Sequence, residues 1–366
     1  MTSKTFFTRQ LLYWYDHTEN RNLPWKEGKN PYYTWLSEIM LQQTRLEQGL
    51  PYYLRFVEQY PKLVDLANAP EDDVLKLWQG LGYYARARNM HATAKFIRDN
   101  YAGEFPKTYE EIRALKGIGD YTAAAIASFA FDLAHAVVDG NVYRVLSRYF
   151  NIETAIDSTD GKKQFSKLAN ELLDPNRPAD FNQAIMDIGA TVCKPASPLC
   201  QHCPIFEKCK ALQLSNIEKL PVKSKKLTKK DRYFYYFVWR SPKGETVIKK
   251  RAEKDIWQGL YDFPLIESTE NICADNDFSK IWESATWKRW TEDQHTKEIP
   301  VKISTTYRQL LTHQNILAIF VEVYGEIPNI FFADNYYTII RIEDLRNFAL
   351  PKTLQYYLEK DLFPWD

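Results

Sequence analysis

The sequence has no apolar run long enough to cross a membrane. Its most apolar window, residues 121–131, falls short of the roughly 18–20 residues that a spanning helix needs. The first twenty residues mix charged and aromatic side chains, and they lack the uninterrupted apolar core and small-residue cleavage site of a secretory signal. We therefore expect neither a membrane segment nor a secretory leader.

Cysteine is scarce, and its distribution excludes a disulfide framework. There are five cysteines, and four of them fall within residues 193–209 at the spacing C-x6-C-x2-C-x5-C, which suits a metal or cluster site in a reducing, cytoplasmic compartment. Four thiolates can hold either a tetrahedral zinc ion or an iron–sulfur cluster, and the spacing alone leaves both open. Cys273 lies far from this group and is expected to be a buried structural thiol. The candidate ligands are Cys193, Cys200, Cys203 and Cys209.

An excess of charge of either sign is also missing, as are internal repeats and low-complexity tracts. The chain has 48 Lys and Arg against 47 Asp and Glu, and a net charge near zero is no argument against a local basic face.

A length of 366 residues with 45% hydrophobic residues fits two packed domains. Apolar spacings of three and four predict helices up to about residue 213, with Asp139 and Asp180 as candidate caps.

The amino-acid composition changes after the four clustered cysteines. Residues 219–230 hold six lysines and no acid, which is typical of a solvated linker, although a contact with a polyanion is the alternative. Aromatic and β-branched residues then predict strands at 231–240, 246–251 and 315–325. The C-terminal part is therefore expected to be an α+β domain.

Residues 115–126, LKGIGDYTAAAI, predict a helix, a tight turn and a second helix. The backbone N–H groups of Gly117, Ile118 and Gly119, together with the start of the second helix, would form a cradle for an anion. An ordinary helix–helix turn explains the two glycines equally well.

Two acids are candidates for chemistry. Asp139 and Asn141 open a helix after an apolar run, where an aspartate is commonly just a cap. Glu38 stands among apolar residues that should raise its carboxyl pKa, although a solvated glutamate on a helix face is the commoner case. Two carboxyl groups in unlike surroundings are what cleavage of a glycosidic bond requires.

Taken together, the motifs resemble the adenine DNA glycosylase (MutY-type) branch of the helix-hairpin-helix, endonuclease III-like glycosylases. The matching segments run in family order from residue 23 to residue 209: LPWK, WLSEIMLQQT, GLGYYARARN, LKGIGDYTAAAI, VVDGNVYRVLSR, FNQAIMDIGATVC and the four-cysteine loop. WQGLYDFP and LLTHQN extend the resemblance into the C-terminal part. In the first of these, Tyr261 stands where tryptophan is frequent in the family, and Lys26 departs from the arginine of some relatives.

The resemblance implies a multidomain fold. Residues 1–213 would form an all-α catalytic region, with a six-helix barrel at about 24–130 and a 4Fe–4S cluster domain built from about 1–23 and 131–213. Residues 214–230 would be a lysine-rich linker. Residues 231–366 would be a Nudix-like domain that recognises 8-oxoguanine, without pyrophosphatase chemistry because the Nudix signature is missing.

The resemblance also implies roles for individual residues. Glu38 would protonate a flipped adenine and activate water, Asp139 would support the sugar cation, Asn141 would hold the geometry, and Tyr121 would act at the sugar face. Gln183 and Met186 resemble adenine-pocket residues, and Gln43 and Tyr83 resemble wedges that enter the duplex. Thr312 and His313 resemble the family's element that contacts the oxidised base, and the four cysteines would bind the 4Fe–4S cluster.

Tyr121 bears on the reaction type. Relatives that excise oxidised pyrimidines carry a lysine there that forms a Schiff base, and a phenol cannot form that imine. We therefore expect hydrolysis of adenine from duplex DNA containing an A:8-oxoguanine or A:G pair, with little strand cleavage. A pyrimidine-lesion glycosylase with lyase activity, and a non-catalytic DNA-binding or redox-sensing protein, are the alternatives. A monomer is expected; a sliding-clamp or mismatch-repair partner is not readable from the sequence.

Overall fold

The chain is divided by its own contacts into two compact units. The structure, a computed structural model, describes residues 2–18, 23–224, 228–273, 277–292 and 299–363. Unit 1 consists of Met1–Asn68 and Asn89–Lys226, and unit 2 of Ala69–Arg88 and Leu227–Asp366. The segment Ala69–Arg88 thus belongs with the C-terminal sheets rather than with the helices that flank it in sequence. Of the lysine-rich linker, residues 225–227 lie outside the described residues.

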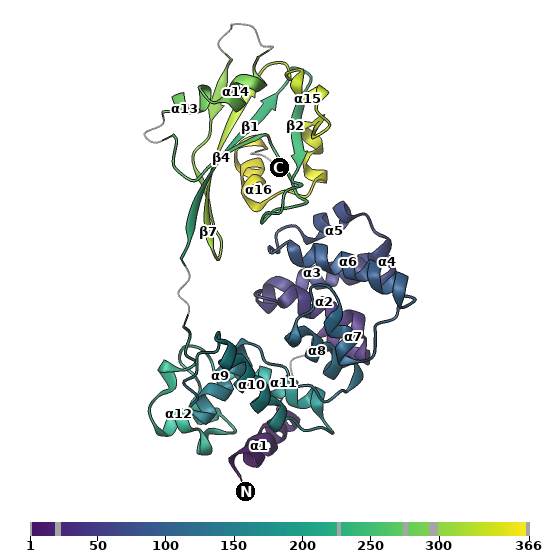
Figure 1. The fold of residues 1–366 in the computed structure, drawn as a ribbon, viewed down its shortest axis with the longest axis vertical. Helices are drawn as coiled ribbons and strands as arrows, with labels where there is room; N and C mark the ends of the chain where they lie inside the picture. The colour runs from purple at the N-terminus through teal and green to yellow at the C-terminus, as the bar shows by residue number, and fades with distance from the viewer. Residues whose placement is uncertain (1, 19–22, 225–227, 274–276, 293–298, 364–366) are drawn as a thin grey trace. The chain divides into compact units, whose positions relative to one another are not determined.

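Unit 1 is helical (Figure 1). Its elements are α1 (Ser3–His17), η1 (Pro24–Lys29), α2 (Pro31–Leu41), α3 (Leu46–Gln59), α4 (Leu63–Asn68), most of α6 (Ala85–Asn100), α7 (Tyr109–Ala114), α8 (Asp120–Phe131), α9 (Gly140–Phe150), α10 (Thr159–Leu172), α11 (Pro178–Thr191), η2 (Cys200–His202), η3 (Phe206–Lys208), α12 (Lys210–Gln213) and η4 (Ile217–Lys219). The helical segments expected from apolar spacing are confirmed. The cap expected at Asp180 is wrong, because Arg177 is the N-cap of α11 and Asp180 lies in the first turn, where it binds Arg177.

The N-terminal helix returns to the second half of unit 1. α1 contacts both α10 and α11. Its Phe7 is fully buried and meets Tyr149 of α9 at 4.8 Å between ring centroids and Phe181 of α11 at 6.5 Å. Burying an aromatic side chain of this size contributes about 2–3 kcal/mol. α1 is therefore part of the core that also carries the cysteine loop.

Unit 2 is built on two sheets. It contains α5 (Glu71–Trp78), β1 (Lys230–Arg240), β2 (Glu245–Lys250), β3 (Tyr261–Asp262), β4 (Leu265–Ser268), α13 (Ser279–Trp282), α14 (Ala285–Trp290), β5 (Val301–Ile303), β6 (Tyr307–Leu310), β7 (Gln314–Tyr324), α15 (Ile330–Ala333), β8 (Tyr337–Arg341), η6 (Ile342–Asn347), α16 (Lys352–Tyr357) and η7 (Leu358–Leu362). One sheet has the order β4–β1–β7–β5, with β6 also paired to β7; the other has the order β3–β2–β8. β1 and β7 are parallel and the other pairs are antiparallel, so the first sheet is mixed.

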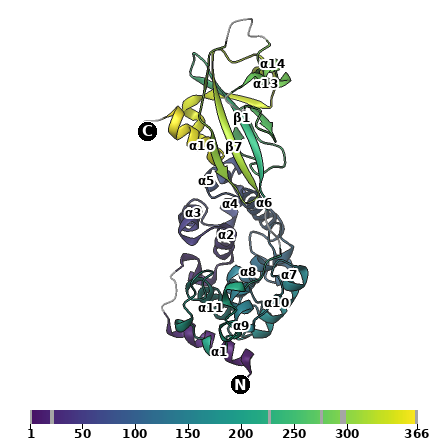
Figure 2. The same ribbon diagram turned by 90° about the vertical axis from the view of Figure 1, so that its left-hand side faces the viewer.

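β1 is buried on both faces, which explains why its sequence is continuously aromatic instead of alternating. Phe237 and Trp239 contact the tryptophans of α14 on one face. On the other face, Tyr236 stacks on Phe320 of β7, which stacks in turn on Tyr357 of α16 at 4.0 Å. The ribbon in Figure 2 shows α16 beside β7. The strands expected at 231–240, 246–251 and 315–325 are confirmed as β1, β2 and β7.

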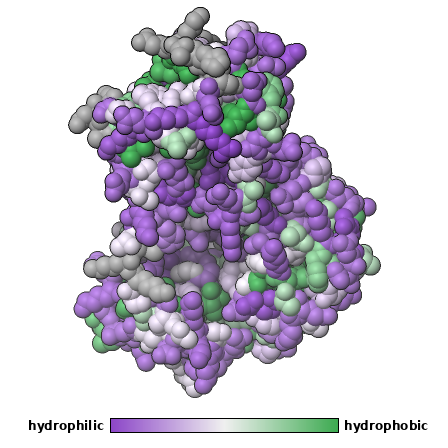
Figure 3. Space-filling view, turned by 45° about the horizontal axis from the view of Figure 1, so that its top comes forward, coloured by the Kyte–Doolittle hydropathy of each residue, from purple (hydrophilic) through white to green (hydrophobic). Residues whose placement is uncertain are grey.

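Buried apolar side chains form the cores of both units. The face drawn in Figure 3 is mostly hydrophilic, with small scattered apolar patches. Among the described residues, no helix combines the length and the apolar character needed to span a membrane.

Asn182 of α11 holds the segment that leads into Asp139. It is fully buried, and its Oδ1 accepts from Val137 N at 3.0 Å. Its Nδ2 donates to Ser128 Oγ at 2.9 Å and to His135 O at 2.8 Å. These three hydrogen bonds connect α8, the following loop and α11.

We expect Asn182→Ala to lower the free energy of unfolding by about 2–4 kcal/mol, because it leaves buried backbone groups without partners. Asn170→Ala is the matched control: Asn170 also accepts from this loop, from Ala136 N at 3.2 Å, but its side chain is exposed. The control should cost less than about 1 kcal/mol. Chemical denaturation of both variants measures the difference, and equal losses would contradict the role given to Asn182.

Candidate active site

Glu38 is a buried carboxyl group on α2. Asn30 caps this helix by accepting from Tyr32 N at 2.9 Å, and Pro31 occupies its first turn. Residues 34–40 are all buried, so the helix has no solvated face at Glu38. Burial raises the pKa of Glu38 to about 7, with a further contribution from the charge of Asp139. The carboxyl group is therefore poised to be protonated near neutral pH.

Tyr121 lies in the first turn of α8 and hydrogen-bonds to Glu38. Burial and the two nearby carboxyl groups raise the pKa of Tyr121 well above its usual value, so the phenol is a neutral donor to the Glu38 carboxylate. The two helices are also joined by Gln42 Nε2, which donates to Thr122 Oγ1 at 3.1 Å. The helix after the Gly-x-Gly turn therefore reaches α2 at the acid itself.

Asp139 is the N-cap of α9, as the sequence predicts, and it is more than a cap. Its Oδ1 accepts from Val142 N at 2.8 Å, and its Oδ2 accepts from Asn141 Nδ2 at 2.7 Å. Burial raises its pKa, and these hydrogen bonds act in the opposite direction by favouring the charged form. The structure thus brings Glu38, Tyr121 and Asp139 together, although Glu38 and Asp139 are 101 residues apart.

Asn141 is fixed by Arg144, a residue that sequence reasoning missed. Arg144 donates to Asn141 Oδ1 at 2.8 Å, to Gly189 O at 2.7 Å and to Cys193 O at 2.6 Å. A Cβ at Gly189 would lie 2.6 Å from the Cβ of Asn141, so only glycine leaves room here. The available signal was the spacing of Arg144, three residues after Asn141 on the same helix.

The pocket candidates lie one turn apart on α11. Gln183 is buried and donates to Asp187 Oδ1 at 2.9 Å, and Met186 is partly buried against the core of unit 1.

The two wedge candidates share an unusual backbone conformation. Gln43 and Tyr83 are both exposed, and their φ angles of +56° and +50° lie in the left-handed region that non-glycine residues seldom occupy. Such backbone strain is concentrated at functional sites.

The hairpin joins α7 to α8. Gly117 has a φ of +79°, and a Cβ there would lie 2.8 Å from the Cβ of Asn89. Gly117 and Gly119 are exposed, whereas Ile118 is buried and its N–H donates to Leu115 O at 3.1 Å. The Ile118 N–H is thus engaged within the turn, so an anion would meet the hairpin at the two glycines.

In unit 2, Thr312 and His313 form the turn between β6 and β7. Leu311 N donates to Gln314 O at 2.8 Å and closes the turn. The Thr312 hydroxyl is hydrogen-bonded to the Tyr83 hydroxyl. The residue expected to meet the oxidised base and one residue expected to enter the duplex are therefore direct neighbours.

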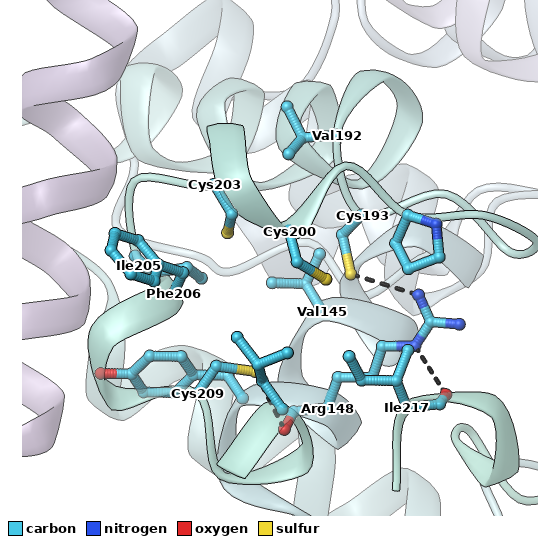
Figure 4. A pocket seen from close by; sticks show the side chains of 13 residues that line it. Val145, Arg148, Val192, Cys193, Cys200, Cys203, Ile205, Phe206, Cys209 and Ile217 are labelled. Atoms are coloured by element: carbon cyan, nitrogen blue, oxygen red, sulfur yellow. Dashed lines mark hydrogen bonds between the residues drawn. The ribbon is translucent and has the colours of Figure 1, made fainter. Parts of the chain in front are cut away.

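The four clustered cysteines line one pocket in unit 1 (Figure 4). The cavity between these side chains is small, with a volume of about 30 Å³. Its other lining residues are mainly apolar, and Arg148 places Nη1 3.5 Å from Cys193 Sγ while donating to Lys194 O and Pro195 O. Burial raises the pKa of Cys203 to about 12, with the neighbouring thiols adding to the effect, so thiolates here need a cationic group to balance them. In the described part of the chain, no three Cys, His, Asp or Glu residues are grouped closely enough to hold a single metal ion.

The chain is similar to known DNA repair glycosylases. The HhH-GPD superfamily of base excision DNA repair proteins matches residues 36–175. The adenine DNA glycosylase of Buchnera aphidicola subsp. Baizongia pistaciae is 36% identical over 86% of this chain and 84% of its own length. That of Buchnera aphidicola subsp. Schizaphis graminum is 40% identical over 70% and 74%. A thermostable thymine-DNA glycosylase superposes with a TM-score of 0.54 at 28% identity, over 58% of this chain and 97% of its own. This chain belongs to the adenine DNA glycosylase family.

Proposed function

We propose that this protein hydrolyses adenine from duplex DNA in which the adenine lies opposite 8-oxoguanine or guanine, and that it leaves an abasic site. The observation that carries the proposal is the environment of Glu38, which raises its pKa to about 7 beside Tyr121 and Asp139. Family membership supports adenine as the base.

The two carboxyl groups suit different steps. A neutral Glu38 can protonate a ring nitrogen of the extruded adenine, which turns the base into a better leaving group. Asp139 accepts two hydrogen bonds that favour its ionised form, and a carboxylate stabilises the positive charge that develops on the sugar. Once Glu38 has given up its proton, it can accept one from the attacking water. Tyr121 then stabilises the anion by its hydrogen bond.

Tyr121 also separates this reaction from its nearest alternative. A lyase of this superfamily needs an amine that attacks the sugar, and the phenol at this position cannot supply one. We expect water as the nucleophile and little strand cleavage. A purely DNA-binding or redox-sensing protein has no use for a buried acid coupled to a second carboxyl group.

The cysteine pocket supports a 4Fe–4S cluster. Four thiol ligands, apolar walls and a nearby arginine fit such a group. Cys193, Cys200, Cys203 and Cys209 would hold it. Its contribution would be structural and electrostatic, because Arg144 connects the Cys193 carbonyl to Asn141 beside Asp139.

For the remaining architecture we propose the family arrangement. Residues of about 24–130 would form the six-helix barrel, and about 1–23 with 131–213 the cluster domain. The sheets of unit 2 would form a Nudix-like domain that reads 8-oxoguanine through Thr312 and His313. Gln183 and Met186 would line the adenine pocket, Gln43 and Tyr83 would enter the duplex, and Gly117 and Gly119 would meet a phosphate. A cytoplasmic monomer is the expected form.

Product analysis tests the function as a whole. With a duplex carrying adenine opposite 8-oxoguanine under single-turnover conditions, we expect free adenine and an unbroken abasic strand that is cleaved only by alkali. Prompt strand scission would indicate a lyase, and the absence of adenine release would indicate a binding protein.

Replacing Glu38 tests the acid. Glu38→Gln keeps the shape and an acceptor for Tyr121 but removes the proton donor, so the single-turnover rate should fall by about 10²–10⁴-fold while mismatch binding persists.

In the unsubstituted protein the rate should decline as pH rises through about 7, because the acid form of Glu38 is lost there. Since ionising a buried carboxyl opposes folding at high pH, Glu38→Gln should also raise Tm at pH 8. Rapid excision by the variant would show that another group supplies the proton.

The recognition turn is tested by specificity. Thr312→Ala combined with His313→Ala should reduce the preference for 8-oxoguanine over guanine by roughly five- to thirtyfold, the loss of about 1–2 kcal/mol of hydrogen bonding. The excision rate at saturating enzyme should change little. Thr305→Ala, at an exposed threonine between β5 and β6, is the control. An unchanged ratio would remove this turn from recognition.

A further inference from the structure

α5 presents one polar face to the sheets of unit 2. Asp72, Lys76 and Gln79 follow one another at spacings of four and three, which places them on the same side of the helix. Lys76 Nζ donates to Phe348 O at 3.0 Å, and Gln79 Oε1 accepts from Leu350 N at 3.0 Å. All three side chains bind groups from the C-terminal part of the chain.

Asp72 is the most connected of the three. Tyr261 donates its hydroxyl to Asp72 Oδ2 at 2.9 Å, and Lys250 forms an ion pair with Asp72 Oδ1. Lys250 and Tyr261 are directly opposite each other in the β2–β3 pair, so two neighbouring strands meet one carboxylate. Phe348 packs edge-on against the Tyr261 ring at 4.8 Å.

The Tyr261 hydroxyl thus reaches a carboxylate on α5. We call Asp72, Lys250 and Tyr261 the docking triad.

The loop that follows α5 is held rigidly to it and carries Tyr83. Trp78 Nε1 donates to Gly82 O at 3.0 Å, and Arg86 donates to the same oxygen at 3.1 Å. The Arg86 guanidinium lies 5.2 Å from the Trp78 ring and 5.4 Å from the Tyr83 ring. The position of Tyr83 is therefore fixed by the position of α5.

We propose that the docking triad is a positioning device that sets the recognition turn against the Tyr83 wedge. Fixing α5 to β2 and β3 places Tyr83 within hydrogen-bonding distance of Thr312, so that one compact unit both enters the duplex and reads the opposite base. Preorganisation of this kind saves the entropy of bringing two contacts together on DNA. The inference rests on the proposed preference for 8-oxoguanine.

Charge reversal and its rescue test the triad in the full-length protein. D72K sets two lysines against each other, and it should lower the preference for 8-oxoguanine over guanine by about three- to tenfold, the range expected for a partly exposed pair and one hydrogen bond. The excision rate from the A:G duplex at saturating enzyme should stay unchanged. D72K combined with K250D restores opposite charges and should bring the ratio back to within about twofold. Tyr261→Phe removes only the hydroxyl and should produce a smaller loss.

The matched control is D73K. Asp73 is the adjacent, exposed residue in the same helical turn. D73K therefore makes the same change in charge near the start of the helix, but it leaves the docking triad intact. It should alter the ratio by less than about twofold. Hydrogen exchange of the α5 amides should accelerate in D72K and recover in the charge swap, which reports on docking independently of DNA.

The outcomes distinguish a failure of the proposed function from a failure of the docking triad alone. If the unsubstituted protein shows no preference for 8-oxoguanine, the proposed function fails and the inference with it. If that preference exists but D72K retains it in full, or the charge swap fails to restore both the ratio and amide protection, the triad does not position the recognition turn and only the inference is overturned.

Discussion

The removal of the Glu38 carboxyl group from water is the constraint on which the candidate site depends. A solvated glutamate has given up its proton at neutral pH and cannot act as an acid, whereas burial on α2 raises the pKa of Glu38 to about 7. The same burial makes the ionised form costly. The hydrogen bond from Tyr121 moderates that cost. In the proposed reaction, the carboxyl group would therefore be able to release a proton and take one back within a single turnover.

The second carboxyl group is held in a different way. Asp139 caps α9 and accepts from Asn141, and Asn141 is fixed by an arginine that also binds backbone oxygens of Gly189 and Cys193. One hydrogen-bonded chain thus joins the acid to the cysteine loop. Arg144 is buried, and its hydrogen bonds are directional. The geometry at Asp139 therefore depends on how the cysteine loop is folded. A group bound by the cysteines would support the site through this chain without touching the DNA base.

Unit 2 combines pieces from distant parts of the sequence into one body. Ala69–Arg88 leaves the helical region in sequence and joins the C-terminal sheets in space. Its polar face is matched by Lys250 and Tyr261, and its terminal loop delivers Tyr83 to Thr312. In the proposed function, contacts on both members of a mispair must be made at once, and the packing of Tyr83 and Thr312 in one compact unit would meet that requirement.

Local patterns in the sequence determined the elements and some of the chemistry. The apolar spacing of the helices, the aromatic runs of β1 and β7, the cap at Asp139 and the clustering of the four cysteines all depend on residues near one another in the chain, and each was predictable for that reason. The cap at Asp180 failed because Pro178 opened the helix earlier.

Tertiary packing alone decided the rest. The pKa of Glu38 depends on which side chains exclude water from it. Arg144 binds Gly189, 45 residues away, and Tyr261 binds Asp72, 189 residues away. Desolvation and long-range hydrogen bonding are properties of surfaces brought together by folding, and no spacing along the chain encodes them. The two acids could be identified as candidates from the sequence, but only the packing of α2, α8 and α9 brings them close together.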